Sequence, residues 1–376
     1  MTSGRTVVRS APGKLFVAGE YAVVEPGTPA ILVAVDRHVT VTVSGPGPGP
    51  APGGADVVIS SDLGPGPVRR QWRDGRLLVP GDDGQRARGG PAHVVSAIET
   101  VGRLLAERGL PLPPLNVSVS SRLHDEGRKY GLGSSGAVTV ATVGAVASFC
   151  GLELSRESRF RLSMIATARI DPKGSGGDLA ASTWGGWLAY QAPDRAFVLD
   201  LARREGIGTA LRAPWPGFAV RPLPQPSGLS LEVGWTGNPA STTSLVSGLH
   251  RRTWRGGDSH RKFVETTTDF VRASVTALEA GDGPGLLHQI RRARRELARL
   301  DDEVGLGIFT PELTALCDAA EESGGAAKPS GAGGGDCGIA LLPAAAPHDI
   351  SRVRQRWAAA GVLPLPVRPA TEGIEE

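Results

Sequence analysis

The sequence has few cysteines, no long apolar run and little net charge, and each shortage excludes a class of protein. Three cysteines in 376 residues cannot build a disulfide framework, and no pair has the C-x-x-C spacing of a zinc site. No apolar run reaches the roughly 18 residues that a membrane-spanning helix needs. The first residues also lack the apolar core of a signal peptide, so we expect a cytoplasmic protein without a membrane partner. The net charge of +3 is too small to indicate a nucleic-acid partner.

The remaining composition is that of a globular chain with more than one core. Hydrophobic residues make up 40% and charged residues 21% of the sequence, and the length exceeds what one hydrophobic core usually supports. The Arg- and Pro-rich stretch between about 201 and 228 suggests the boundary. We therefore expect two domains, at residues 1–225 and 226–376, of which the second is α+β.

Hydrophobic periodicity predicts an alternation of strands and helices along the chain. Strands are expected at Val7–Arg9, Lys14–Ala18, Ala30–Val35, Val39–Val43, Val68–Trp72, Leu77–Val79, Leu115–Ser121, Trp187–Gln191, Ala196–Leu199, Leu229–Thr236 and Ile339–Leu342. Helices are expected at His93–Glu107, Ala137–Phe149, Ser158–Ala168, Ser241–His250, His260–Ala280, Gly285–Leu300, Pro311–Glu322 and Ile350–Ala360.

One glycine-rich segment, GLGSSG at 131–136, leads directly into a buried helix of small residues. Such a loop leaves backbone N–H groups unpaired at the positive end of the helix dipole, which suits a phosphate. The hydroxyls of Ser134 and Ser135 could donate to phosphate oxygens or bind a metal. The same pattern also fits a tightly packed, capped helix with no ligand, and the segment is not a Walker A loop, which ends in Gly-Lys-Ser/Thr.

Three further segments carry reactive side chains among glycines. KGSGGD at 173–178 surrounds Asp178, whose simpler interpretation is a helix N-cap. KPSGAGGGDCG at 328–338 has the glycine density of an anion-binding nest, or of a flexible linker. APGKLFVAGEY at 11–21 places Lys14 at the start of a strand and Glu20 in the turn after it. Together these segments favour an anionic ligand bound between two domains. Phosphoryl transfer needs positioning, positive charge and a metal, and these segments supply the first two.

The order APGK…GEY, GLGSSGA, GSGGD and SGAGGGD resembles the three-motif pattern of the GHMP small-molecule kinases over almost the whole chain. Within that family, the stretches APGKLFVAGEYAVVEPG, GRKYGLGSSG, GWTGNPASTTSLV and KPSGAGGGDCGIAL are most similar to the bacterial phosphomevalonate kinases. The resemblance implies the two-domain fold of the family. Its N-terminal α/β domain is like the second domain of ribosomal protein S5, and its C-terminal α+β domain is ferredoxin-like. The implied reaction is the ATP-dependent phosphorylation of 5-phosphomevalonate in isoprenoid biosynthesis.

The resemblance also implies a set of site residues. Lys14 and Asp178 would be catalytic, and Ser135 would bind Mg²⁺. ATP would contact Lys129, Tyr130, Gly131, Leu132, Gly133, Ser134, Ser135 and Gly136. The acceptor would contact Lys14, Glu20, Tyr21, Ser175, Gly176, Thr242, Thr243, Gly331, Ala332 and Gly333.

Two alternatives and one departure from the family pattern remain. The chain could be a mevalonate kinase or another GHMP kinase acting on a related acceptor, or a GHMP-fold sensor without activity. Retention of Lys14, Ser134, Ser135 and Asp178 argues against a sensor. Several relatives carry a metal-binding Glu in the helix before the aspartate loop, whereas SMIATARI at 163–170 has no carboxylate, which leaves the Mg²⁺ ligand set open.

Overall fold

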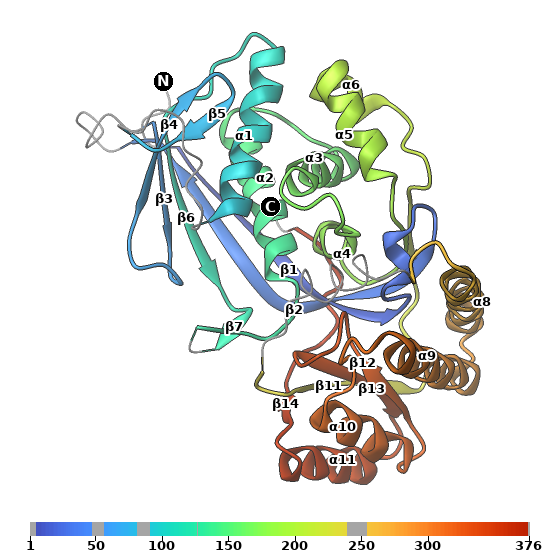
Figure 1. Ribbon diagram of the computed structural model, residues 1–376. Coiled ribbons are helices and arrows are strands. Elements are labelled where there is room, and N and C mark those ends of the chain that lie inside the picture. The colour runs from blue at the N-terminus through green and yellow to red at the C-terminus, as the bar shows by residue number, and fades with distance from the viewer. Residues whose placement is uncertain (1–4, 47–55, 81–90, 126, 239–253, 375–376) are drawn as a thin grey trace.

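The computed structural model describes residues 5–46, 56–80, 91–125, 127–238 and 254–374. Its strands form two large sheets in different halves of the molecule (Figure 1). Within the described residues the first sheet has eight strands, in the order β10-β9-β2-β6-β3-β4-β5 with β1 paired to β2. Its strands are β1 (Thr6–Ala18), β2 (Pro29–Ser44), β3 (Val57–Ser61), β4 (Val68–Arg73), β5 (Arg76–Leu78), β6 (Leu115–Ser121), β9 (Trp187–Gln191) and β10 (Ala219–Leu223).

The first two strands are longer than their sequence suggests. The four short strands expected before residue 45 all lie within strands, but their division into four is wrong, because β1 runs unbroken past Pro12 and β2 past the polar residues 36–38. A register shift in the antiparallel pairing between Pro12 and Gly13 absorbs the irregularity in β1. Gly13 is needed there, since a Cβ would lie 2.7 Å from the carbonyl oxygen of Leu132. The bulge therefore places β1 directly against the 131–136 loop.

Helices α1, α2, α3 and α4 pack together over one face of the first sheet (Figure 1). The most deeply buried is α2, which lies on β1 and β2 and consists mainly of Ala, Val, Gly and Thr. The elements of this half are η1 (Ala22–Val24), α1 (Ala92–Glu107), α2 (Ser134–Phe149), α3 (Arg156–Ala168), α4 (Gly177–Trp184), α5 (Arg195–Arg204), α6 (Ile207–Arg212) and the small hairpin β7 (His124–Asp125) and β8 (Arg128–Lys129).

The strand expected at Ala196–Leu199 is wrong, because this segment lies within the helix α5. Asp194 caps the helix by accepting a hydrogen bond from the amide of Phe197 at 3.1 Å. Val198 is buried, and Leu201 and Ala202 pack beside it at helical spacing. A four-residue apolar run did not distinguish a strand from the buried face of a helix.

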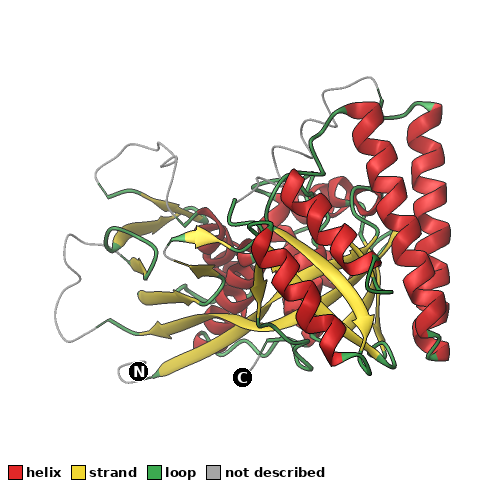
Figure 2. Cartoon of the chain, turned by 90° about the horizontal axis from the view of Figure 1, so that it is seen from below, coloured by secondary structure: helices red, strands yellow, loops and turns green. Residues whose placement is uncertain are grey.

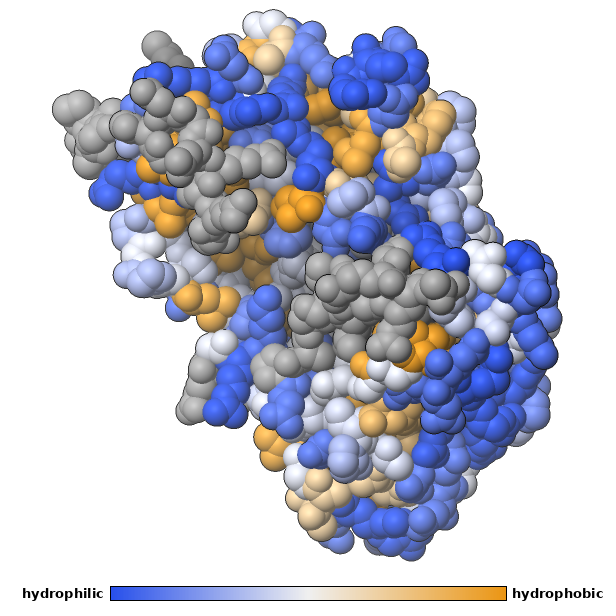
Figure 3. Space-filling view, in the orientation of Figure 1, coloured by the Kyte–Doolittle hydropathy of each residue, from blue (hydrophilic) through white to orange (hydrophobic). Residues whose placement is uncertain are grey.

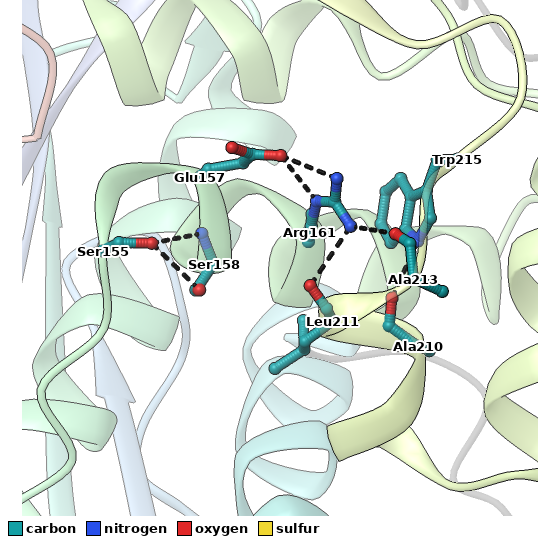
Figure 4. A network of polar contacts seen from close by, with 8 residues as sticks. All are labelled: Ser155, Glu157, Ser158, Arg161, Ala210, Leu211, Ala213 and Trp215. Atoms are coloured by element: carbon teal, nitrogen blue, oxygen red, sulfur yellow. Dashed lines mark hydrogen bonds and ion pairs between the residues drawn. The ribbon is translucent and has the colours of Figure 1, made fainter.

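Helix α3 is held on its outer side by a polar cluster around Arg161 (Figure 4). The guanidinium donates to the carbonyl oxygen of Leu211 at 3.1 Å and to that of Ala213, and it pairs with Glu157 at 2.7 Å. It also lies 4.9 Å from the ring centroid of Trp215. The chain after α6 is thereby attached to α3, which in turn supports α4.

As far as it is described, the second half consists of an antiparallel sheet and four helices. In the described residues the strand order is β12-β13-β11-β14. The two longest helices, α8 and α9, pack side by side along one flank of the molecule (Figure 2). The elements are β11 (Leu229–Trp235), α8 (Asp258–Ala280), α9 (Gly283–Val304), α10 (Pro311–Glu321), β12 (Ala326–Pro329), β13 (Cys337–Pro343), α11 (Pro347–Ala359) and β14 (Leu363–Leu365).

Strands β12 and β14 were not expected from the sequence, whereas the other described elements of this half lie close to where periodicity placed them. The expected helix Ser241–His250 lies outside the described residues. Hydrophilic residues dominate the flank where α8 and α9 lie (Figure 3). Among the described helices, none is long and apolar enough to cross a membrane.

Candidate active site

The 131–136 loop enters α2 through a left-handed residue. Gly133 is the N-cap of the helix, with φ of 75°, and Gly131 has φ of 79°, a region that favours glycine. Helix geometry leaves the first amides of α2 without partners in the preceding turn, so they point into the loop. The sixteen-residue helix adds the positive end of its dipole at this point. The loop therefore has the geometry of an anion site.

Lys14 and Asp178 flank this loop from two other elements. A Cβ on Gly133 would lie 2.9 Å from Cγ of Lys14 and 3.4 Å from Cβ of Asp178. A Cβ on Gly136 would lie 2.6 Å from the Asp178 carboxyl carbon. The amide of Lys14 donates to the carbonyl oxygen of Leu132 at 2.8 Å. Both reactive side chains thus reach the start of α2, although among the described residues no ion pair joins them.

Asp178 is positioned by the tight start of α4. The N-cap is Gly176, with φ of 74°, so the alternative interpretation of Asp178 as the N-cap is wrong. The hydroxyl of Tyr190 donates to the carbonyl oxygen of Ser175 at 2.6 Å, and burial raises the pKa of that tyrosine. Ser182 of α4 donates to the carbonyl oxygen of Pro12 at 2.7 Å, two residues before Lys14. These contacts connect the carboxylate rigidly to β1.

The third glycine-rich segment approaches from the second half of the molecule. A Cβ on Gly331 would lie 3.8 Å from Nζ of Lys14, and one on Gly131 would lie 2.5 Å from the Asp336 side chain. The thiol of Cys337 donates to the carbonyl oxygen of Tyr130 at 2.9 Å. The structure thus brings the glycine-rich segments of both halves together around Lys14.

Glu20 and Tyr21, expected at the acceptor, lie buried against this third segment. The Glu20 carboxylate pairs with the Lys328 ammonium, and the Tyr21 hydroxyl donates to the carbonyl oxygen of Ala332. Burial, reinforced by the charges of Asp301 and Glu20, raises the pKa of Tyr21, so the phenol remains a donor. Their contact with substrate stays a prediction.

The remaining expected residues are distributed around the loop. Ser175 is half-buried and its Oγ accepts from the amide of Gly177 at 3.3 Å. Lys129 is exposed on β8 beside the loop, and Gly333 is buried against Ile308. Thr242 and Thr243 lie outside the described residues.

The sequence interpretation missed His93, which lies at the start of α1. Its Nδ1 is 3.4 Å from Oγ1 of Thr139, and that hydroxyl donates to the carbonyl oxygen of Ser135 at 2.7 Å. Burial lowers the pKa of His93, the nearby Lys129 lowers it further, and the charges of Asp178 and Asp171 oppose this effect. No spacing pattern marks a single histidine on an amphipathic helix, so only its place in space connects it with the loop.

Comparisons with known proteins agree with this arrangement. The family descriptions "GHMP kinases N terminal domain" and "GHMP kinases C terminal" match residues 92–186 and 275–361. A phosphomevalonate kinase from Streptomyces sp. (strain CL190) is 75% identical over 376 residues, covering 100% of both chains. A mevalonate kinase from Thermococcus onnurineus is 29% identical, covering 98% of this chain and 97% of the relative.

A solved structure has the same fold over nearly its full length. Streptococcus pneumoniae phosphomevalonate kinase, in complex with phosphomevalonate and AMPPNP, matches with a TM-score of 0.82 and 28% identity. The match covers 96% of this chain and 99% of that one. The geometry of the site and the full-length relative agree. The chain belongs to the GHMP kinase family.

Proposed function

We propose that this protein transfers the γ-phosphoryl group of ATP to the phosphate of (R)-5-phosphomevalonate, giving ADP and (R)-5-diphosphomevalonate. The observation that carries the proposal is the 75% identity, over the whole chain, with the curated Streptomyces phosphomevalonate kinase. Identity with the mevalonate kinase cited above is 29%. This contrast favours the phosphorylated acceptor over mevalonate within the family.

The site residues suit a transfer between two anions. The first amides of α2, with Lys129 through Gly136 around them, would bind the ATP phosphates. Lys14 extends its ammonium from β1 toward both Gly133 and Gly331, where it can bridge the donor and acceptor phosphates. Ser175, Gly176, Gly331, Ala332 and Gly333 would surround the acceptor, and Thr242 and Thr243 would complete that side.

Asp178 has little proton to remove in this reaction. A phosphate monoester has a second pKa of about 6, so at neutral pH the acceptor oxygen is mostly an anion already. The carboxylate lies against Gly136, and the Asp178 Cβ and the Lys14 stem both approach Gly133. We therefore assign it to orienting Lys14, or to holding Mg²⁺ when that ion binds, and not to general base catalysis.

The donor set at the loop fits Mg²⁺. This ion is usually held by one or two carboxylates together with substrate phosphates and water. Among the described residues no group of three or more His, Cys, Asp and Glu could hold a metal, so the protein would supply few ligands, for which we propose Asp178 and the hydroxyl of Ser135. When bound, the ion would neutralise the phosphate charge.

We further propose a cytoplasmic location and a domain boundary at residues 225/226. All three cysteines are free thiols, as is usual in a reducing compartment. The boundary is supported by the sheets, since β10 ends at Leu223 and β11 begins at Leu229.

The proposed function is tested by measuring ADP release with mevalonate, 5-phosphomevalonate and 5-diphosphomevalonate offered separately. We expect release with 5-phosphomevalonate, with stoichiometric formation of diphosphomevalonate, and its loss when divalent cations are chelated. Preferential turnover of mevalonate would replace the proposal by the mevalonate kinase alternative. Tight acceptor binding without any ADP release would indicate a sensor.

A further inference from the structure

A buried ion pair joins the two halves of the molecule next to the proposed active site. Lys328, whose side chain has no exposed area, is the third residue of β12, and its ammonium contacts the Glu20 carboxylate after β1. The same ammonium donates to the carbonyl oxygen of Pro329 at 2.7 Å. The two residues are 308 positions apart, and we call them the Glu20–Lys328 pair.

Hydrogen bonds, in addition to the ion pair, connect this region with the third glycine-rich segment. Oε1 of Glu20, which binds Lys328, also accepts the amide of Gly331 at 3.4 Å. Ser330 donates its hydroxyl to the carbonyl oxygen of Phe16 at 3.0 Å and accepts the Phe16 amide at 2.9 Å. Ser330 and Gly331, the first two residues after β12, are therefore both bonded to the end of β1 or to the turn after it.

The partners on β1 lie close to the reactive lysine. Phe16 is two residues after Lys14, and the Lys14 ammonium lies 5.2 Å from the Phe16 ring centroid. Gly331, bonded to Glu20, is the glycine of the third segment that faces Nζ of Lys14. A shift of β12 relative to β1 would consequently move Gly331 away from that ammonium.

Stability alone is a weak reason for such a pair. Two charges removed from water lose hydration that their attraction often fails to repay, and apolar replacements of similar volume are frequently as stable. In some proteins such pairs are retained because their single geometry fixes the register of the segments that they join.

We propose that Glu20 and Lys328 are positioning residues for phosphoryl transfer: they hold the third glycine-rich segment in register with β1, so that Gly331 stays against the Lys14 ammonium. This inference rests on the proposed function. It assigns both residues to alignment of the site, and it makes Glu20 a positioning residue and not a direct ligand of the acceptor.

The test is the double variant Glu20→Gln/Lys328→Met, compared with both single variants. Each single change leaves a buried group without its charged partner, so both thermal midpoint and kcat should fall. The double variant removes both charges with little change in volume, so its midpoint should recover toward that of the unaltered protein. Its kcat should stay at least about tenfold low, with KM values changed less than about threefold, because the substrates still bind but are misaligned.

The control is Glu232→Gln/Arg354→Met. Glu232 is a buried carboxylate on β11 and pairs at 2.7 Å with Arg354 of α11, whose side chain is 53% exposed. Its replacement should leave kcat unchanged. Recovery of both midpoint and kcat in the Glu20/Lys328 double variant would overturn the proposal and leave the pair as a purely structural contact.

If the double variant does not fold, Ser330→Ala decides instead, because it removes both bonds to Phe16 at little cost in volume. We expect its kcat to fall severalfold, and a kcat equal to that of the unaltered protein would overturn the proposal. An unaltered protein inactive on 5-phosphomevalonate would count against the proposed function, and the same comparison would then use whichever acceptor is turned over.

Discussion

At the scale of single residues, the site depends on how little room the glycines leave around Lys14 and Asp178. Gly133 separates the two side chains, and any larger residue there would contact both. Lys14 is also nearly buried, with 9% of its surface exposed. The buried ammonium attracts an anion in the loop strongly, because little water is present to screen its charge.

The first prediction compares Lys14→Ala with Asp178→Asn. If the ammonium bridges two phosphates and the carboxylate mainly orients it, Lys14→Ala should reduce kcat at least as much as Asp178→Asn. Activity should also decline below about pH 6, as the acceptor phosphate becomes protonated. The measurement is steady-state ADP release from pH 5 to 8.

The opposite pattern would contradict this assignment. Nearly normal turnover in Lys14→Ala, with Asp178→Asn inactive and a pH profile that belongs to one enzyme group, would identify Asp178 as a general base.

At the scale of elements, the first turn of α2 contains a residue that disfavours a helix but leaves room for the Asp178 side chain. Glycine is a poor helix former, yet Gly136 lies in the first turn of α2. The reason is its neighbour, since the Asp178 carboxyl group occupies the space that a Cβ would need. Local propensity and the requirements of the site are therefore opposed at this position.

The second prediction follows from that conflict. Gly136→Ala should reduce kcat by at least about tenfold through displacement of Asp178, while the gain in helix propensity offsets part of any loss of stability. Steady-state kinetics and a thermal midpoint together test this. Gly66→Ala is the control, because a Cβ there would meet nothing within 4 Å. Unchanged kcat in Gly136→Ala would show that Asp178 can move without consequence.

The contact between α1 and α2 carries a third prediction, on pH. The pKa of His93 is lowered in the folded protein, chiefly by burial, from an ordinary value of about 6.5. Below that pH the unfolded chain takes up the proton more readily than the folded one, so stability present at pH 7 is lost as pH falls toward the folded pKa. His93→Gln should therefore reduce the decline of the thermal midpoint between pH 7.5 and 5.5.

Part of that decline should remain in His93→Gln, because burial also lowers the pKa of His124 and His260. Replacement of His348, which is exposed on α11, serves as the control. An identical midpoint profile for His93→Gln and the unaltered protein would contradict the interpretation.

At the scale of the whole molecule, two of the junctions between the halves bear directly on the site. The first junction is the Glu20–Lys328 pair with its neighbours, and the second is the C-terminal segment at 367–374. This segment leaves the second half and returns to the first sheet, where Ala370 donates to the carbonyl oxygen of Ala34 at 2.9 Å. Its last residues reach the helices behind the site, since Ile374 fills the space beside Gly144 of α2.

The fourth prediction concerns Gly373, which packs backbone to backbone on α4. A Cβ there would lie 2.1 Å from the carbonyl oxygen of Thr183, in the last turn of the helix that begins beside Asp178. Gly373→Ala should therefore displace the C-terminal segment, lower the thermal midpoint and reduce kcat. Calorimetry with ADP-release kinetics tests this, again with Gly66→Ala as control. Full stability and activity would show that the segment contributes nothing to α4.

Most elements and the position of the 131–136 loop before a buried helix were accessible from the sequence because their signals are local. The 3.6-residue period predicted α1, α8, α9 and α11, and a strict alternation predicted β6. The glycines and serines of 131–136 indicated an anion site through backbone chemistry that depends only on adjacent residues. Their order along the chain was enough to identify the family.

Pairing between distant segments was decided only by the tertiary structure. Lys328 was read as part of a glycine-rich loop, yet it lies in a strand because β13 and Glu20 supply its partners. Asp178 was open to interpretation as a helix cap until Gly176 was seen to occupy that position. The motifs and their chemistry are thus determined by the sequence alone. The register that aligns Lys14 with Gly331 depends on contacts between residues hundreds of positions apart, which no local pattern encodes.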